Sequence, residues 1–257
     1  MKKNVFYILM IALLALQSCS LNSEITYHKD AASTAVMDLD MKEAMDMLNA
    51  MSSESDKNND FAEMEKLPKK WTSLYDIEKK DGKLKTTNPD SIRLMKKIFM
   101  KSNSDGKDFT GFSIKMDHFT KEDHKAVKNL SSERVLSNQL NEMTFSDWNG
   151  KTLTIDTKML NLDSFKEIMS GQDMAEKKDS SAEEDAANIT SMMSTMFKSI
   201  GTKLKFENKI KSITGKHDWI SKIDDHTIEI KYDLEAMFGD DKKPLKNADK
   251  TITIVTE

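Results

Sequence analysis

The stretch Lys203–Leu234, KLKFENKIKSITGKHDWISKIDDHTIEIKYDL, indicates how this chain folds. Apolar and polar residues alternate at Leu204 and Phe206 near its start and over 228–232 near its end. A period of two is typical of strands with one buried face. Between these segments, Thr214-Gly215 marks a turn. The stretch therefore predicts strands joined by turns rather than a helical unit.

Periodic apolar residues and turn residues also predict strands and helices along the rest of the chain. An Asn-Gly pair at Asn149-Gly150 indicates a hairpin. The Asp40–Glu43 segment resembles a capping box that opens a helix. Strands are expected over 25–37, 109–119, 144–155 and 251–256, and helices over 41–51, 88–99, 120–130, 163–170 and 189–200, the last ended by Gly201. This mixture predicts an α+β fold with a mainly antiparallel sheet and several packed amphipathic helices.

The N-terminus carries the most specific motif. Met1-Lys2-Lys3 precedes an apolar run from Val5 to Leu16, and Leu16-Gln17-Ser18-Cys19 follows. This resembles a bacterial lipoprotein signal peptide with its lipobox. The resemblance implies removal of residues 1–18 and lipid attachment at Cys19, with palmitate as an expected acyl group. We then expect a lipid-anchored tether over 19–24 and one α+β domain over 25–257.

Three stretches together resemble uncharacterised lipoproteins of Bacteroidetes. They are ITYHKDAASTAVMDLD (25–40), FTGFSIKMDHFTKEDHKAVKNL (109–130) and the 203–234 segment. They share the order of lipobox, first strand with Tyr and Asp, central strand leading into a helix, and late hairpin. The hairpin is also distantly similar to the LppM-type lipoprotein domain, which implies a role in binding envelope lipids or glycolipids.

Composition narrows the classes of function. The chain is 38% hydrophobic and 32% charged, with a formal charge of −4. Lysines and acids are interspersed, and the runs Lys66–Lys70 and Lys242–Lys243 are expected to be solvated, so no broad basic face and no nucleic-acid partner are expected. Cys19 is the one cysteine of the sequence, which excludes an internal disulfide and a cysteine-based metal site. The segment 172–185 is acidic and poor in apolar residues, and we expect a flexible loop there.

Candidate sites for chemistry are sparse. His118 and His124 lie beside Asp117 and Asp123, but their spacing of six is not that of paired ligands on one helix, so we expect no metal site. The segment 101–112 resembles a calcium-binding loop, but the residues at its first and last ligand positions are of the wrong type to bind calcium. Ordinary exposed or hydrogen-bonded histidines and plain turns, including Asp224-Asp225, are the expectation. The remaining histidines are His28, His217 and His226.

Nineteen methionines leave more than one interpretation open. Met41, Met45 and Met51 fall on one face of a predicted helix, as do Met192 and Met196 on another. Methionines at this spacing most often fill a core, but they also form adaptable apolar grooves or, with soft ligands, copper sites.

Together these features predict a protein of the cell envelope that is not an enzyme and needs no cofactor. We expect an outer-membrane lipoprotein on the periplasmic face, with a binding or scaffolding role toward an envelope protein. The alternative is a carrier of lipid or glycolipid, with the helix over 189–200 as a cavity wall. A hydrolase is the third hypothesis, and it requires clustered histidines and carboxylates, such as His118 near Asp123.

Overall fold

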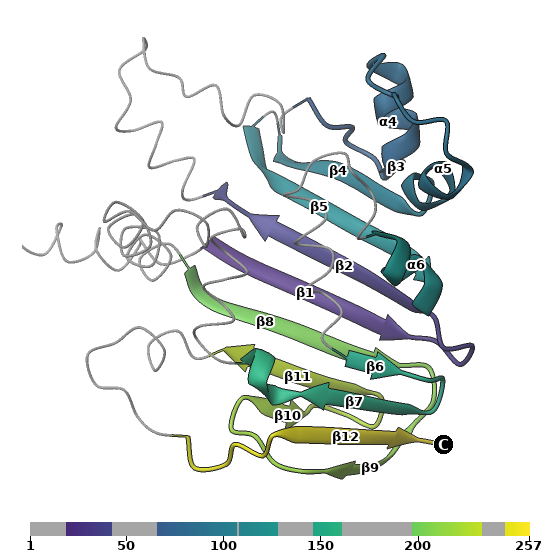
Figure 1. The fold of residues 1–257 in the computed structure, drawn as a ribbon. Coiled ribbons are helices and arrows are strands. Elements are labelled where there is room, and N and C mark those ends of the chain that lie inside the picture. The colour runs from purple at the N-terminus through teal and green to yellow at the C-terminus, as the bar shows by residue number, and fades with distance from the viewer. Residues whose placement is uncertain (1–18, 43–65, 107, 128–145, 161–196, 233–244) are drawn as a thin grey trace, which may run out of the picture.

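The computed structural model describes residues 19–42, 66–106, 108–127, 146–160, 197–232 and 245–257 (Figure 1). Over these ranges the chain forms two β-sheets with short helices beside them, so the predicted α+β class is confirmed. Within the same ranges no helix is both long and apolar enough to cross a membrane.

The larger sheet has eight strands. Their spatial order is β10 (Ile220–Lys222), β11 (Thr227–Tyr232), β8 (Phe197–Phe206), β1 (Cys19–Tyr27), β2 (Ser33–Asp40), β5 (Asp108–Phe119), β4 (Ile98–Asp105) and β3 (Thr72–Ser73). Every neighbouring pair is antiparallel except β1 and β8, which run parallel. Because β5 is also parallel in direction to β1, the strands β1, β5 and β8 all end at the same end of the sheet.

The smaller sheet covers one part of the larger one, and helices cover another. Its strands, in spatial order, are β6 (Ser146–Trp148), β7 (Thr152–Asp156), β12 (Thr251–Thr256) and β9 (Ile210–Thr214), and the 3-10 turn η2 (Thr157–Leu160) follows β7. The helices α4 (Leu74–Lys80), α5 (Pro89–Met95) and α6 (Lys121–Val127) lie beside β3, β4 and β5 (Figure 1). Asn88 caps α5 through its side-chain oxygen, which accepts a hydrogen bond from Asp90 N–H at 2.9 Å.

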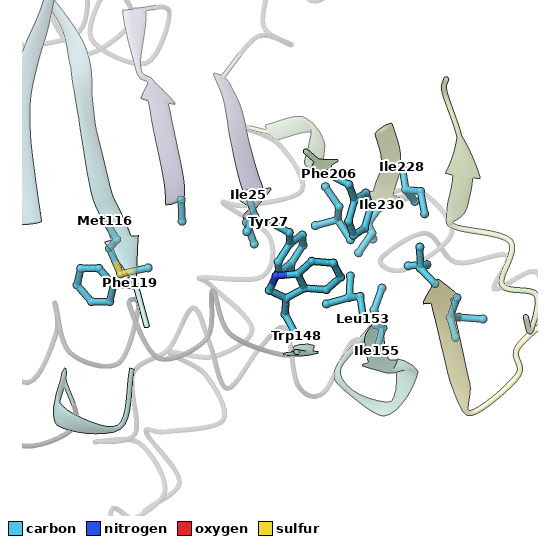
Figure 2. Close-up of a cluster of buried hydrophobic side chains, with 14 of the residues drawn as sticks. Ile25, Tyr27, Met116, Phe119, Trp148, Leu153, Ile155, Phe206, Ile228 and Ile230 are labelled. Atoms are coloured by element: carbon cyan, nitrogen blue, oxygen red, sulfur yellow. The ribbon is translucent and has the colours of Figure 1, made fainter. Parts of the chain in front are cut away.

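The core lies between the two sheets and continues beneath the helices. In Figure 2 the indole of Trp148 lies against Tyr27, with Leu153 and Ile155 of the small sheet close by. The Tyr27 ring also stacks on Phe206, with centroids 5.3 Å apart. These side chains are at most 8% exposed, and burial of such apolar surface is the main force that holds the two sheets together.

Several predicted elements are confirmed. The hairpin around Asn149-Gly150 is present as β6–β7. The predicted strands over 109–119 and 251–256 match β5 and β12. The predicted helices at 88–99 and 120–130 begin where α5 and α6 begin, although α5 ends at Met95 because β4 starts at Ile98.

Three predictions at the strand ends are wrong. The strand expected over 25–37 is two strands, because the chain turns over 28–32, where Ala31 has φ 65° and Asp30 Oδ1 accepts the Ala32 N–H. The tether expected over 19–24 belongs to β1, since Cys19 pairs with β8 and the residues over 20–24 pair with both β2 and β8. The helix expected through residue 200 is wrong from Phe197 onward, where β8 begins beside β1.

The other predicted helices and the acidic loop are not tested. The positions 43–51, 163–170, 172–185 and 189–196 lie outside the described residues.

Candidate functional site

Polar side chains gather at the end of the large sheet where β1, β5 and β8 finish. His28 follows the last residue of β1, Glu207 follows the last residue of β8, and His118 is the penultimate residue of β5. Asp30 lies in the turn after β1, and Thr34 lies in β2 beside them. The shared direction of three strands therefore brings together residues that are far apart in the sequence.

His28 links two of these groups. Its Nδ1 lies 2.8 Å from Glu207 Oε1, and its Nε2 lies 2.9 Å from Thr34 Oγ1. A carboxylate only accepts hydrogen bonds, so the Nδ1 of His28 donates to Glu207, while Nε2 is the ring nitrogen that meets the Thr34 hydroxyl. This is the hydrogen-bond order of an acid–base–hydroxyl relay.

His118 forms a second pair beside the first. Its Nε2 lies 2.8 Å from Asp30 Oδ2, and its ring centroid lies 4.9 Å from that of His28. Its backbone has φ 50°, in the left-handed region, and its N–H donates to Thr34 Oγ1 at 3.1 Å. One threonine hydroxyl therefore joins both histidines.

Both carboxylates of this histidine cluster also hold backbone. Asp30 accepts the Ala32 N–H, which with His118 lowers the pKa of the Asp30 carboxyl. Glu207 accepts from Lys29 N–H at 2.9 Å, and His28 together with that bond lowers the pKa of Glu207. The cluster therefore locks the turn after β1 to the end of β8. No set of three or more histidine, cysteine or acidic residues within the described ranges is arranged to hold a metal ion.

A buried carboxylate, Asp123, forms a separate charged centre. It is fully buried and accepts from Arg93 Nη1 and, at 2.7 Å, from Lys97 Nζ. It also accepts the Thr120 N–H at 3.0 Å, at the start of α6. Burial alone would raise the pKa of Asp123, but Lys97, the Thr120 N–H and Arg93 together lower it to about 2. Asp123 is therefore ionised and structural.

The example given for the hydrolase hypothesis, His118 beside Asp123, is not a pair in the structure. Asp123 binds Lys97, whose Nζ also donates to the His118 carbonyl oxygen, and the His118 side chain binds Asp30 instead. His124 instead meets Ser33 Oγ at 3.1 Å, and burial lowers the pKa of His124 to about 4. The histidines that cluster are His28 and His118.

The remaining candidates are mostly structural. The segment 101–112 is the β4–β5 hairpin and not a calcium loop of the usual pattern. Asp224 accepts the His226 N–H at 2.7 Å in the β10–β11 turn, as predicted for turn chemistry. His217 is buried beside Trp219. The methionines over 45–51 and 192–196 lie outside the described residues.

Sequence reasoning did not single out His28, Asp30 or Glu207. Each of them lies just after a strand ends, and their proximity depends on which strands run parallel. A polar residue after the last apolar residue of a strand was the available signal, and it is common to many loops.

Comparison with known proteins adds one structural similarity. No protein-family model matches the chain, and no curated protein matches it. The solved NMR structure of the folded domain of LppM from Mycobacterium tuberculosis resembles it with a TM-score of 0.35 and 9% identity, over 94% of this chain and 92% of that one. The resemblance to Bacteroidetes lipoproteins stays a prediction.

Proposed function

We propose that this chain is a lipid-anchored protein of the bacterial cell envelope, whose domain binds a partner without performing chemistry. The leader over 1–18 and the cysteine after it are the observation that carries the proposal. An anchor of more than one acyl chain would hold the domain stably at a membrane.

The position of Cys19 in the fold sets how such an anchor would orient the domain. Cys19 is the first residue of β1, at the end of the sheet opposite the histidine cluster. A strand rises about 3.3 Å per residue, so roughly 30 Å separates the anchoring residue from His28. A lipid on Cys19 would place the histidine cluster on the side of the domain that faces away from the membrane.

The non-enzymatic part of the proposal rests on how the polar groups are used. Asp30 and Glu207 each accept a backbone N–H as well as a histidine, and Asp123 holds two basic side chains and the start of a helix. The Thr34 hydroxyl, the one group of the relay that could act as a nucleophile, already accepts the His118 N–H. Such multiply used groups favour a structural role over proton transfer to a substrate.

The anchor is tested by Cys19→Ser in cells of an envelope-bearing bacterial host. We expect the wild type as a mature, acylated protein in the membrane fraction, and the variant as unprocessed precursor without lipid. Ser18→Ala is the matched control, because it keeps a small residue before the cysteine and leaves processing intact. Mature acylated protein from Cys19→Ser, seen by mass spectrometry, would refute the anchor.

A lipid carrier is the second candidate, and one feature of the large sheet favours it. Residues that pair directly across neighbouring strands have their side chains on the same face of the sheet. Leu39 therefore lies beside Phe112. Met37 and Met100 lie two residues further along the strands, on the same face, which carries the core. These four apolar side chains are only half-buried, whereas Met116 on the same face is 1% exposed. The apolar face is thus sealed near the histidine cluster and less covered toward Cys19.

Native mass spectrometry distinguishes the two candidates. A carrier purified from an envelope without detergent would retain a reproducible added mass of one lipid or glycolipid, and Met37→Gln with Phe112→Gln would remove it. Protein of bare mass that remains folded would exclude the carrier and leave partner binding.

A further inference from the structure

One edge of the large sheet is strongly basic, although the chain as a whole is acidic. Residues 66–101 contain eleven lysine and arginine residues against four aspartate and glutamate residues, a formal charge of +7 in a chain of −4. These residues form β3, α4, α5 and β4, which lie together at one side of the molecule (Figure 1). The basic edge is our name for this unit, and it corrects the expectation that no broad basic face exists.

Little of this charge is neutralised by neighbours. Arg93 and Lys97 pair with the buried Asp123, and Arg93 also approaches Asp90 at 3.7 Å. Other lysines of the edge take part in none of the ion pairs between described residues, and all of them but Lys101 are exposed. They are Lys66, Lys69, Lys70, Lys80, Lys85, Lys96 and Lys101. The edge therefore presents positive charge to solvent.

Aromatic rings lie among these lysines. Trp71 is 37% exposed, and the Nζ atoms of Lys101 and Lys115 lie 5.0 and 5.8 Å from its ring centroid. The Lys115 Nζ also lies 4.6 Å from the centroid of the Phe99 ring, and the two residues pair across β5 and β4. These contacts are cation–π interactions, in which the lysine stems also cover part of the exposed rings.

A second such contact extends the pattern onto α4 and α5. Lys96 and Lys79 place their Nζ atoms 4.9 and 5.8 Å from the centroid of Tyr75. Tryptophan and tyrosine prefer the headgroup level of a bilayer, and lysines near it are attracted to anionic lipids. Two aromatic–lysine groups on one edge thus combine both preferences.

We infer that the basic edge docks onto a membrane surface that carries anionic lipid headgroups. The inference deepens the proposed function and rests on it in one respect: a lipid on Cys19 keeps the edge close to a membrane, so that a weak contact suffices. Charge complementarity selects an anionic surface, and the exposed Trp71 favours a lipid interface over a nucleic acid or an acidic protein. The contact is reversible and depends on salt, because exposed charges are screened beyond about 8 Å at physiological ionic strength.

Vesicle binding tests the inference without the anchor. The chain from Cys19 to Glu257, which keeps every described residue, is produced without the leader and therefore without lipid. Its sedimentation is measured with phosphatidylcholine vesicles and with vesicles that contain about one third phosphatidylglycerol. Each lysine near an anionic surface contributes about fivefold to binding. We expect Lys69→Gln with Lys70→Gln and Lys101→Gln to lower binding to the anionic vesicles by roughly a hundredfold.

The matched control removes the same charge from the other side of the molecule. Lys209→Gln, Lys211→Gln and Lys216→Gln change exposed lysines at or beside β9 of the small sheet. Both triple variants are first shown to be folded by circular dichroism. We expect the control to bind like the wild-type chain, and 0.5 M salt to abolish binding of both.

Each outcome decides the inference. Equal binding to both kinds of vesicle, or equal loss in both triple variants, would overturn it. Binding to heparin or duplex DNA without binding to anionic vesicles would also overturn it and indicate a polyanionic chain as the partner. Because the protein in this assay carries no lipid, a failure here leaves the Cys19 experiment untouched, and a failure there leaves this result standing.

Discussion

Replacing Asp123 by asparagine removes a buried charge that links α6 to Arg93 of α5 and to Lys97, which also binds the end of β5. The side chain is fully buried and meets Arg93, Lys97 and Thr120. Asparagine keeps the shape and some hydrogen bonds but loses the charge. The two basic side chains then lose their common partner, although both keep partial access to water, with exposed fractions of 45% and 29%.

The pKa of Asp123 gives the size of the effect. Its fall from 3.8 to about 2 corresponds to about 2.5 kcal/mol of stability near neutral pH, at about 1.4 kcal/mol per pKa unit. For a domain of this size, a loss of that order lowers the melting temperature by roughly 5–10 °C. We expect Asp123→Asn to show this loss in thermal and denaturant unfolding at pH 7.

The pH dependence tests the same argument independently. The folded-state pKa of Asp123 is lower than the unfolded value, so its contribution is complete above about pH 4 and is lost as the pH falls toward 2. The difference in unfolding free energy between wild type and Asp123→Asn should therefore be largest at neutral pH and shrink toward zero near pH 2.

Asp117→Asn is the matched control for this prediction. Asp117 lies 3.4 Å from Lys115 and is 47% exposed, and exposed pairs contribute about 0–1 kcal/mol. A loss of less than about 1 kcal/mol for Asp123→Asn, or a loss that stays constant between pH 7 and pH 2.5, would refute the role assigned to the buried carboxylate.

Substitutions at three further positions test the packing and the histidine cluster. Gly111→Ala should destabilise the fold by more than about 3 kcal/mol or prevent folding, because Gly111 has φ 146° and an added Cβ would meet Leu39 O at 2.0 Å; soluble yield and circular dichroism check this. Trp148→Phe should cost about 1–3 kcal/mol in denaturant unfolding, because the Nε1–H bond to His28 O at 2.8 Å is lost while most of the buried ring area remains, and a larger loss for Trp148→Ala should follow. Glu207→Gln should cost less than about 1 kcal/mol, because its pair with His28 is partly exposed, and a larger loss of unfolding free energy would contradict that assignment.

The local elements were predictable where the sequence carries the whole signal. Asn149-Gly150 specifies a tight hairpin turn, and Asn88 with Pro89 specifies a helix start, because both depend on backbone preferences of neighbouring residues. The helix expected through residue 200 failed from Phe197 for the opposite reason. Pairing with β1 satisfies the backbone there, and a tertiary partner overrides apolar residues at helical spacing.

The candidate sites depended more heavily on the fold. His28 and Glu207 are 179 residues apart and meet because β1 and β8 run parallel, and nothing in their neighbouring residues specifies that pairing. The basic edge escaped notice for a related reason. The run Lys66–Lys70 was interpreted only as a solvated segment, and the remaining lysines are scattered up to Lys101, so only the fold brings them to one edge.

The sequence by itself predicted the α+β class and the tight turns, which the structure confirms, and a leader that ends before Cys19, which stays a prediction, because each follows from residues that are adjacent or periodic along the chain. Tertiary structure alone decided that Cys19 begins a central strand, that His28 meets His118, and that the lysines over 66–101 share one edge. The physical reason is that strand order and direction come from burying two apolar faces against each other. Apolar burial over the whole chain determines the strand order, and the strand order then fixes the positions of polar side chains that contribute little to that burial.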